Sequence, residues 1–405
     1  MSNQCEFRPE DWGPLAARYQ DDQPRTILAL DGGGIRGLIT LGVLRRIESL
    51  LQEQLGVGDD FRLCDFFDYI GGTSTGAIIS AGLARGMSIA EIEEFYQAFA
   101  QKVFKARFNR FTAKFDARRL EELLHTTFRN KDNSDADLRP INLNCLLLAV
   151  TRNASTDSAW PISSNPAAKY NDPRRSDCNL RIPLWQIVRA SSAAPTFFDP
   201  SVIQLDPRDP RSKAVFVDGA TTAYNNPGLL MYRMATMNAY NLCWKTGVEK
   251  LLLVSVGTGT APAPRQDPNS PNFHLLANAK AVVSSLLHQA TIDQDIMCRL
   301  LGRCCWGQEL DSEIGNLVNT GNNFLYSRYN AELTARGLDA LGLDHIRAET
   351  ITPIDSLKGM ASLTEIGQTV AKHVDEAHFG PFLQSKAEAV KRNMELRKSR
   401  EFGVL

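Results

Sequence analysis

Short apolar runs that end at glycine alternate with longer amphipathic segments along the chain from residue 25. The run 25–30 stops at an aspartate and three glycines, which is typical of a buried strand that enters a turn. Apolar residues then recur at steps of three and four from Leu38 to Leu55, which predicts a helix with one apolar face. A second short run, 66–70, again ends at glycines, and the small and apolar residues at 77–84 predict a buried helix. The order strand, glycine turn, helix therefore occurs twice in succession.

Later apolar runs continue this alternation. We predict buried strands at 143–150, 214–217 and 251–256. Strands that alternate with helices favour a three-layer α/β fold, with a mostly parallel central sheet and helices on both of its faces. We expect the polar segments 152–180 and 204–213 to be excursions from that sheet.

The Pro-rich stretch 261–271 is typical of a linker. We therefore expect three parts: an N-terminal extension at 1–24, a main α/β domain at 25–262, and a C-terminal region at 263–405. The C-terminal region should be mainly helical and should pack on the main domain.

Composition and charge exclude several classes of protein. With 45 Lys and Arg against 46 Asp and Glu, the net charge is −1, so no global field attracts nucleic acid or an anionic membrane. The N-terminus is acidic and lacks the apolar run of a secretory signal, and no stretch approaches the roughly 18 apolar residues of a membrane span. The eight cysteines are scattered, without metal-ligand spacing, which predicts free, mostly buried thiols in a reducing cytosol.

The first glycine turn has the spacing of a nucleotide-binding loop. Gly32, Gly34 and Gly37 satisfy G-x-G-x-x-G between a predicted strand and a predicted helix. A dinucleotide site also needs an acidic residue at the end of the next strand, and a P-loop needs a Lys after its glycines; the sequence has neither. The turn does provide free backbone N–H groups at a helix N-terminus, which stabilise anions of any kind.

The second glycine turn matches the G-x-S-x-G pattern of a nucleophile elbow. Gly72 and Gly76 flank Ser74, again between a predicted strand and a predicted helix. Such a turn brings the two backbones together, requires glycine on both sides, and exposes the serine hydroxyl. By itself the pattern also fits a glycine-softened turn with an idle serine.

A serine nucleophile needs a base, and histidine is the usual one. None of the six histidines lies at the end of a predicted strand, although folding can bring any of them to the site. Asp218 does lie there, directly before Gly219, and in open parallel sheets the ligand crevice is at the carboxyl ends of the strands. An Asp-Gly pair is also common in plain turns, so both interpretations stay open at this point.

Three motifs, taken in order, resemble those of the patatin-like phospholipase family. They are Asp-Gly-Gly-Gly-Ile-Arg-Gly at 31–37, Gly-Thr-Ser-Thr-Gly at 72–76 and Asp-Gly-Ala at 218–220. Segments 190–195, 225–227 and 255–259 are also similar to the family. The resemblance covers about residues 25–260.

The resemblance implies a patatin-like catalytic domain at 25–262, with lipid acyl hydrolase activity and no metal or other cofactor. Ser74 would be the nucleophile and Asp218 the general base of a dyad. The backbone N–H groups of three glycines would form the oxyanion hole: Gly32, Gly33 and Gly34. A Cβ on Gly33 would then crowd the oxyanion. Because an exposed Asp is a poor base for a hydroxyl, we expect Asp218 to be partly desolvated, with a raised pKa.

Arg36 matches the motif arginine, and it either braces the glycine loop or meets a lipid phosphate. The resemblance also implies a phospholipid substrate. The absent secretory signal and the cysteine pattern favour a cytoplasmic enzyme, which would contact the inner face of the membrane, and the net charge of −1 favours no nucleic acid polymer as partner. Because some bacterial members are antiphage effectors switched on by cyclic nucleotides, we expect a cyclic-nucleotide activator and a homo-oligomer. Two alternatives remain, a glycine-loop nucleotide-binding module and a non-catalytic patatin-fold scaffold.

Two segments of the chain are basic. Between residues 102 and 119, seven basic residues accompany one acid, and four phenylalanines from Phe104 to Phe115 recur at helical spacing. This pattern predicts either an interfacial element on anionic headgroups or an ordinary helix whose Phe stripe belongs to the core. From Leu383 onward, six Lys or Arg accompany three Glu, and we expect a solvated terminal helix or tail there.

Overall fold

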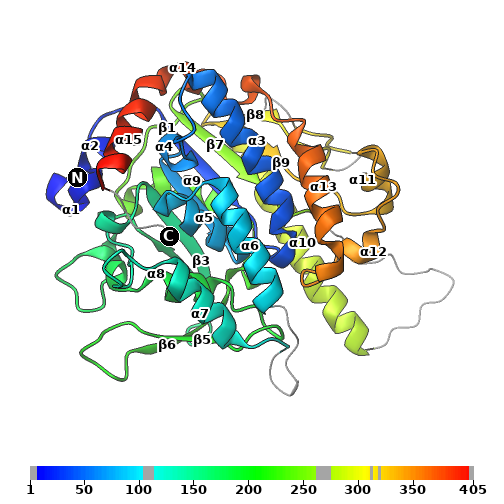
Figure 1. The fold of residues 1–405 in the computed structure, drawn as a ribbon, viewed down its shortest axis with the longest axis horizontal. Helices are drawn as coiled ribbons and strands as arrows, with labels where there is room; N and C mark the ends of the chain where they lie inside the picture. Colours follow the sequence, from blue (N-terminus) through cyan, green and yellow to red (C-terminus); the bar gives the residue numbers. More distant parts are fainter. Residues whose placement is uncertain (1–6, 104–113, 261–274, 311–312, 318–320, 401–405) are drawn as a thin grey trace.

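The computed structural model describes residues 7–103, 114–260, 275–310, 313–317 and 321–400. A nine-stranded sheet lies between two layers of helices (Figure 1). The strand order is β5-β6-β3-β2-β1-β7-β9-β8, and β4 pairs with β3 beside this path. The predicted three-layer α/β fold is confirmed.

Six strands form the parallel part of the sheet. They are β1 (Arg25–Leu30), β2 (Tyr69–Thr73), β3 (Leu146–Asn153), β7 (Leu251–Val256), β8 (Arg303–Trp306) and β9 (Leu325–Tyr329). Every residue of β1 and β7 is buried, which explains why both sequences are continuous apolar runs rather than alternating ones. The strands predicted at 25–30 and 251–256 have the observed bounds.

The second predicted strand has the wrong bounds. Phe66 ends the short helix α4 (Leu63–Phe66), and β2 runs through the glycines that we expected to terminate it. Glycine is required inside this strand because its neighbours approach closely: a Cβ on Gly71 would lie 2.7 Å from the Cβ of Leu148.

Three strands run antiparallel to their neighbours: β4 (Ser158–Ser163), β5 (Ser201–Gln204) and β6 (Lys213–Asp218). Segment 152–180 is therefore not wholly an excursion, since β4 lies within it. Its sequence looks polar because the first two residues of β4 are exposed and the next two are half-buried.

Helices cover both faces of the sheet, and alternate residues of β1 face the two layers. Leu28 and Leu30 pack in one apolar cluster, and Ile27 and Ala29 in the other. The first layer contains α3 (Gly37–Leu55), α5 (Thr75–Arg85), α6 (Ile89–Val103) and α13 (Met360–Ala371). The second contains α1 (Pro9–Trp12), α2 (Ala16–Tyr19), α9 (Gly228–Thr236) and α10 (Leu275–Leu301). The other helices are α7 (Ala117–Thr127), α8 (Leu184–Ser191), α11 (Ala335–Ala340), α12 (Ala348–Ile351), α14 (Phe382–Ser385) and α15 (Ala387–Arg400).

The C-terminal residues add strands as well as helices. β9 pairs directly with β7, so the sheet continues across the division that we expected at residue 262. Helix α13 lies along α3 (Figure 1), where a Cβ on Gly42 would lie only 2.7 Å from the carbonyl carbon of Gly367. The two helices can approach this closely because glycine has no side chain.

A buried charge cluster ties both ends of the chain to the sheet. The Asp68 carboxylate, just before β2, forms ion pairs with Arg18 of the N-terminal extension and with Lys386. Arg397 of α15 pairs with Asp65, also buried. The C-terminal basic residues are therefore not all solvated as we expected, because Lys386 and Arg397 reach buried carboxylates.

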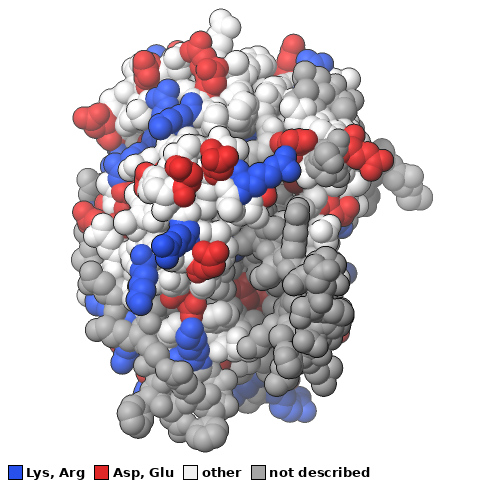
Figure 2. All heavy atoms as spheres, turned by 90° about the vertical axis from the view of Figure 1, so that its right-hand side faces the viewer, with Lys and Arg blue, Asp and Glu red and all other residues white. Residues whose placement is uncertain are grey.

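The cysteines and the surface of the protein bear on three further expectations from the sequence. The described residues include six free cysteines, five of them buried as expected, whereas Cys243 is disulfide-bonded, contrary to the expectation of free thiols. No helix in the described part of the chain is both long and apolar enough to cross a membrane. On the face shown in Figure 2, Lys and Arg side chains lie interspersed with Asp and Glu.

Candidate active site

Ser74 occupies a sharp turn between β2 and α5. Its backbone has φ 54° and ψ −119°, a strained conformation for a residue with a side chain. The flanking glycines make the turn possible: a Cβ on Gly72 would lie 2.1 Å from the carbonyl carbon of Gly76, and one on Gly76 would lie 2.3 Å from the Leu30 oxygen. The close approach of strand and helix predicted from the G-x-S-x-G pattern is present.

Asp218 lies beside Ser74, close enough for the serine hydroxyl to lower the pKa of the Asp218 carboxyl. The Asp218 side chain is buried, with only 2% of the residue exposed, and its Oδ1 accepts from the N–H of Ala220 at 2.8 Å. Burial raises the pKa of Asp218 to about 7, although the Ser74 hydroxyl and the Ala220 N–H both act to lower it. The carboxylate therefore has the desolvation and the raised pKa that a base for a serine hydroxyl needs.

The register of the sheet brings these two residues together across β3. Thr73, directly before Ser74, pairs with Val150 of β3, and Asp218 pairs with Thr151. We predicted β6 as part of a mostly parallel sheet, but it runs antiparallel to β3 and shares only three residue pairs with it. Asp218 still lies near the carboxyl end of β3, because β6 enters from beyond that end.

The glycine turn after β1 lies against the serine, since a Cβ on Gly32 would be 3.3 Å from the Cβ of Ser74. The Gly32 N–H donates to the Asn225 carbonyl at 3.2 Å, so this group is occupied. Gly33 and Gly34 donate their N–H groups to no other described residue. Of the three donors expected for an oxyanion, Gly33 and Gly34 are therefore the two without a described partner. A Cβ on Gly33 would also meet Thr258 Oγ1 at 2.1 Å, so a side chain there would displace Thr258.

One segment similar to the family, 190–195, and the residue directly before another, Tyr224, hold this geometry in place. The Ser191 hydroxyl accepts from the Ser74 N–H at 2.9 Å and donates to the Val150 carbonyl at 2.7 Å. The Ala193 carbonyl accepts from the Asp218 N–H at 3.0 Å, and the Tyr224 carbonyl accepts from the hydroxyl of the residue before Ser74 at 2.6 Å. The motif reasoning had assigned no role to these residues.

Arg36 ends the single 3₁₀ turn Gly34–Arg36 that follows the glycine loop. Its Nε is buried and has no hydrogen-bond partner among the described residues. Burial lowers the pKa of Arg36 to about 10, and the nearby Asp31 offsets part of that effect. The bracing role we considered for Arg36 therefore has no hydrogen bond behind it in the described part of the chain.

Histidine does not enter the site in the described part of the chain. None of the five described histidines hydrogen-bonds to Ser74 or Asp218; His125, for example, pairs with Asp135, and His378 bonds the Tyr329 hydroxyl. The sixth, His274, lies outside the described residues. No group of three or more potential metal ligands occurs among the described residues.

The basic segment is described only at its two ends, because residues 104–113 lie outside the described part. Phe115, its last phenylalanine, is buried and stacks on Phe197. Lys114 forms an ion pair with Asp355 from the C-terminal region. Phe115 thus belongs to the core, as one of our two interpretations stated.

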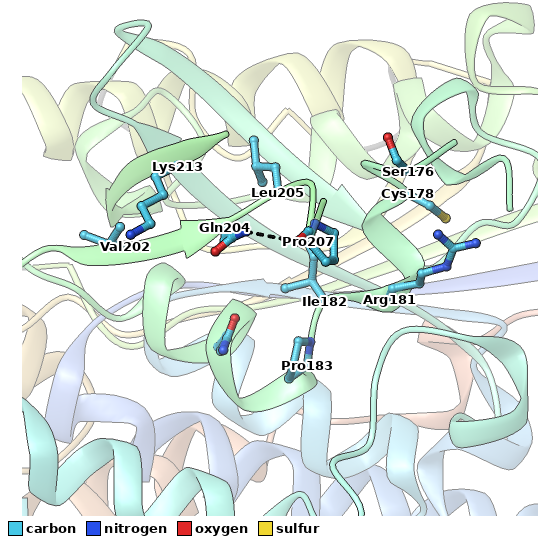
Figure 3. A pocket seen from close by; sticks show the side chains of 11 residues that line it. Ser176, Cys178, Arg181, Ile182, Pro183, Val202, Gln204, Leu205, Pro207 and Lys213 are labelled. Atoms are coloured by element: carbon cyan, nitrogen blue, oxygen red, sulfur yellow. Dashed lines mark hydrogen bonds between the residues drawn. The ribbon is translucent and has the colours of Figure 1, made fainter. Parts of the chain in front are cut away.

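A separate cavity of about 520 Å³ lies between the β5–β6 hairpin and the start of α8 (Figure 3). Its lining includes two cations, Arg181 and Lys213, and two amides, Gln186 and Gln204, but no carboxylate. The cations lie toward opposite ends of the cavity in Figure 3. Both α8 and β6 run from this cavity to the site, since α8 ends at Ser191 and β6 ends at the buried aspartate.

Comparisons with known proteins identify similar chains. The family model "Patatin-like phospholipase" matches residues 28–231. Patatin-like phospholipase 1 of Plasmodium falciparum is 30% identical over 64% of this chain and 39% of its own length. A cGAMP-activated phospholipase of Vibrio cholerae is 33% identical over 50% of this chain and 56% of its own, and a cUMP-AMP-activated phospholipase of Escherichia coli is 29% identical over 62% and 70%. The chain spans less than two thirds of the first two relatives.

Proposed function

The chain belongs to the patatin-like phospholipase family, and from this premise we propose that it is a serine lipid acyl hydrolase of the phospholipase A type. Its substrates would be the carboxylic ester bonds of membrane phospholipids. The observation that carries the proposal is the placement of Ser74, in its strained turn, beside the buried Asp218 carboxyl, whose pKa the serine hydroxyl lowers. Burying a carboxyl beside a serine without a catalytic role would cost stability and bring no function.

The reaction would proceed through an acyl-enzyme. Ser74 Oγ attacks the ester carbonyl carbon while Asp218 accepts the hydroxyl proton, and the N–H groups of Gly33 and Gly34 stabilise the oxyanion. The C–O bond then breaks, and Asp218 returns the proton to the leaving alcohol, a lysophospholipid. In the second half, Asp218 takes a proton from water, the hydroxide attacks the acyl group, and Ser74 leaves with that proton restored.

Arg36 would bind the phosphate of the lipid headgroup. A guanidinium that is partly desolvated and has a buried N–H without an acceptor among the described residues gains from an anionic ligand. A phosphodiester near the scissile ester would supply that acceptor. The protein would therefore act on phospholipids in preference to neutral esters. We place its action at the inner face of the membrane, from the cytoplasm, as part of the same proposal.

The relatives' names support regulation by a cyclic nucleotide and a role in antiviral defence. The cavity beside α8 and β6 is our candidate for the activator site, because its two separated cations suit the two phosphates of a cyclic dinucleotide. Its volume is in the usual range of small-molecule sites, about 300–1,000 Å³. A ligand there would act on the two elements that hold Ser74 and Asp218. A homo-oligomer would be a further consequence of activation.

Product analysis tests the proposed function. The purified protein is incubated with vesicles of mixed bacterial phospholipids, with and without a panel of cyclic nucleotides, beside a Ser74→Ala control. We expect free fatty acid and lysophospholipid from the wild type only. Release of a headgroup phosphate instead would assign the protein to another bond of the lipid. No release under any condition would favour the nucleotide-binding module or the scaffold.

Calorimetric binding of cGAMP and cUMP-AMP tests the activator site. Lys213→Glu should weaken binding, because the change puts a negative charge in the cavity. Lys391→Glu on α15 is the control, because it makes the same charge change at a residue that does not line the cavity. It should bind the nucleotides like the wild type. Equal binding by all three proteins would remove the cavity from the proposal.

A further inference from the structure

We propose that Arg328 of β9, outside the region matched by the family model, is a positioning residue of the active site that fixes the glycine loop through Asp31. The inference rests on the proposed function, because it concerns the loop that would stabilise the oxyanion. No sequence motif singled out Arg328. It acts through other residues and touches none of the reacting atoms.

The Arg328 guanidinium holds Asp31 with a two-pronged contact. Nη1 donates to Asp31 Oδ1 at 2.7 Å, and Nη2 donates to Oδ2. Nη1 also donates to the Ser255 hydroxyl of β7 at 2.7 Å. Arg328 is 2% exposed and Asp31 is 3% exposed, so water does not screen the pair. A planar fork on a carboxylate fixes orientation as well as distance, which an ammonium group does not.

The sheet places this contact at the base of the glycine loop. Arg328 pairs with Ser255 across the β9–β7 ladder, and the neighbouring β7 residue, Val256, pairs with Leu30 at the end of β1. Figure 1 shows β9, β7 and β1 side by side. Arg328 therefore reaches past one strand to Asp31, the first residue after β1, whose backbone N–H donates to the Val256 carbonyl at 3.1 Å.

A second contact from the C-terminal region holds the far end of the loop. The Ile35 N–H donates to the Ile354 carbonyl at 2.8 Å, and a Cβ on Gly34 would lie 2.3 Å from that same oxygen. The N–H groups of Gly33 and Gly34 thus lie between two fixed points. One is the ion pair of Asp31 with Arg328, and the other is the hydrogen bond from Ile35 to Ile354. Glycine peptides turn easily, so donors in such a loop need fixed ends to stay preorganised.

A positioning role and a merely structural ion pair predict different kinetics. Oxyanion donors act in the transition state and little in the ground state, so their misplacement lowers kcat and leaves KM nearly unchanged. Loss of an ordinary buried ion pair lowers stability and leaves the kcat of the folded fraction intact. The Arg18–Asp68 pair is a control, because it is equally buried and joins the N-terminal extension to the start of β2, the end of that strand opposite Ser74.

The experiment compares Arg328→Gln, Asp31→Asn, their double variant and Arg18→Gln. It measures kcat and KM on a soluble short-chain ester, well below each melting temperature. We expect kcat of Arg328→Gln to fall by about 10²-fold, the usual cost of misplacing catalytic groups by about 1 Å. Arg18→Gln should lose thermal stability but keep kcat. The double variant should be no worse than either single one, since each single change leaves a buried charge unpaired.

Amide hydrogen exchange of segment 31–37 gives a readout that needs no turnover. Exchange there should accelerate in Arg328→Gln and stay unchanged in Arg18→Gln. If the wild type does not hydrolyse esters, the proposed function fails. The exchange rates still show whether Arg328 fixes the glycine loop.

Unchanged exchange, or a kcat of folded Arg328→Gln within about twofold of the wild type, would overturn the inference. So would an equal loss of kcat in Arg18→Gln at equal loss of stability. If Arg328→Gln does not fold, Arg328→Lys takes its place, because it keeps the charge and removes the fork.

Discussion

Asp218→Asn removes the proposed base, but it should also remove a loss of stability that the wild type suffers as the pH rises. The stability of the variant relative to the wild type should therefore increase with pH. In the wild type the pKa of this carboxyl is about 7 in the folded state, against a reference value of 3.8, because burial penalises the charged form. The folded state therefore binds the proton more tightly than the unfolded state. The contribution of this group to stability is full below pH 3.8 and is lost as the pH rises through 7.

The size of the effect follows from the shift in pKa. The difference between about 7 and 3.8 corresponds to about 4 kcal/mol of unfolding free energy lost above pH 8, at about 1.36 kcal/mol for each pH unit. Between pH 5 and pH 8 the loss is about 2.5 kcal/mol, because part of it has already occurred by pH 5. Asparagine is uncharged at both values, so the variant should escape this loss.

Urea unfolding at several values between pH 5 and pH 8 measures the effect. The stability difference between Asp218→Asn and the wild type should shift in favour of the variant by about 2.5 kcal/mol over that range. Ser74→Ala is the control, because it keeps the buried carboxylate and removes the hydroxyl that lowers its pKa. It should show at least the pH dependence of the wild type. A difference between Asp218→Asn and the wild type that does not change with pH would refute the desolvated base.

Three further predictions concern the base, the elbow and the buried charges. The kcat/KM for ester hydrolysis should rise with pH around a midpoint near 7, as the base loses its proton; a profile flat from pH 5 to 8 would contradict it. Gly76→Ala should destabilise the protein by about 3 kcal/mol in urea unfolding, because the new Cβ meets strand backbone, whereas Gly58→Ala, near only an Asp side-chain oxygen, should not. Asp68→Asn should cost about 3–5 kcal/mol by the same assay, because it leaves Arg18 and Lys386 as uncompensated buried cations; a loss below about 1 kcal/mol would show that these cations find other partners.

The elbow was predictable from sequence because its requirements are local. Gly72 and Gly76 are needed where the strand and helix backbones touch, and any chain that makes this turn must have small residues at those two positions. The helix at 38–55 was predictable because its apolar residues recur at a helical period. The helix at 77–84 was predictable because small and apolar residues fill a helix that is buried on all sides.

Other features depend on contacts between distant parts of the chain. Arg328 lies 297 residues from Asp31, and Lys386 lies 318 residues from Asp68, and nothing in their local sequence marks either as buried. The direction of β6 is set by its hairpin with β5, which no periodicity reports. The Gly32 N–H is occupied because the Asn225 carbonyl lies against it, and only the folded chain shows this.

The central claim is that Ser74 and Asp218 act together as nucleophile and base, and a double-mutant comparison of turnover tests it most directly. Ser74→Ala and Asp218→Ala should each lower the rate of phospholipid hydrolysis by on the order of a thousandfold, and the double variant should be hardly slower than either, because residues that act as a unit do not contribute independently. Losses that multiply in the double variant would contradict the dyad, and another base would then have to be found for the serine.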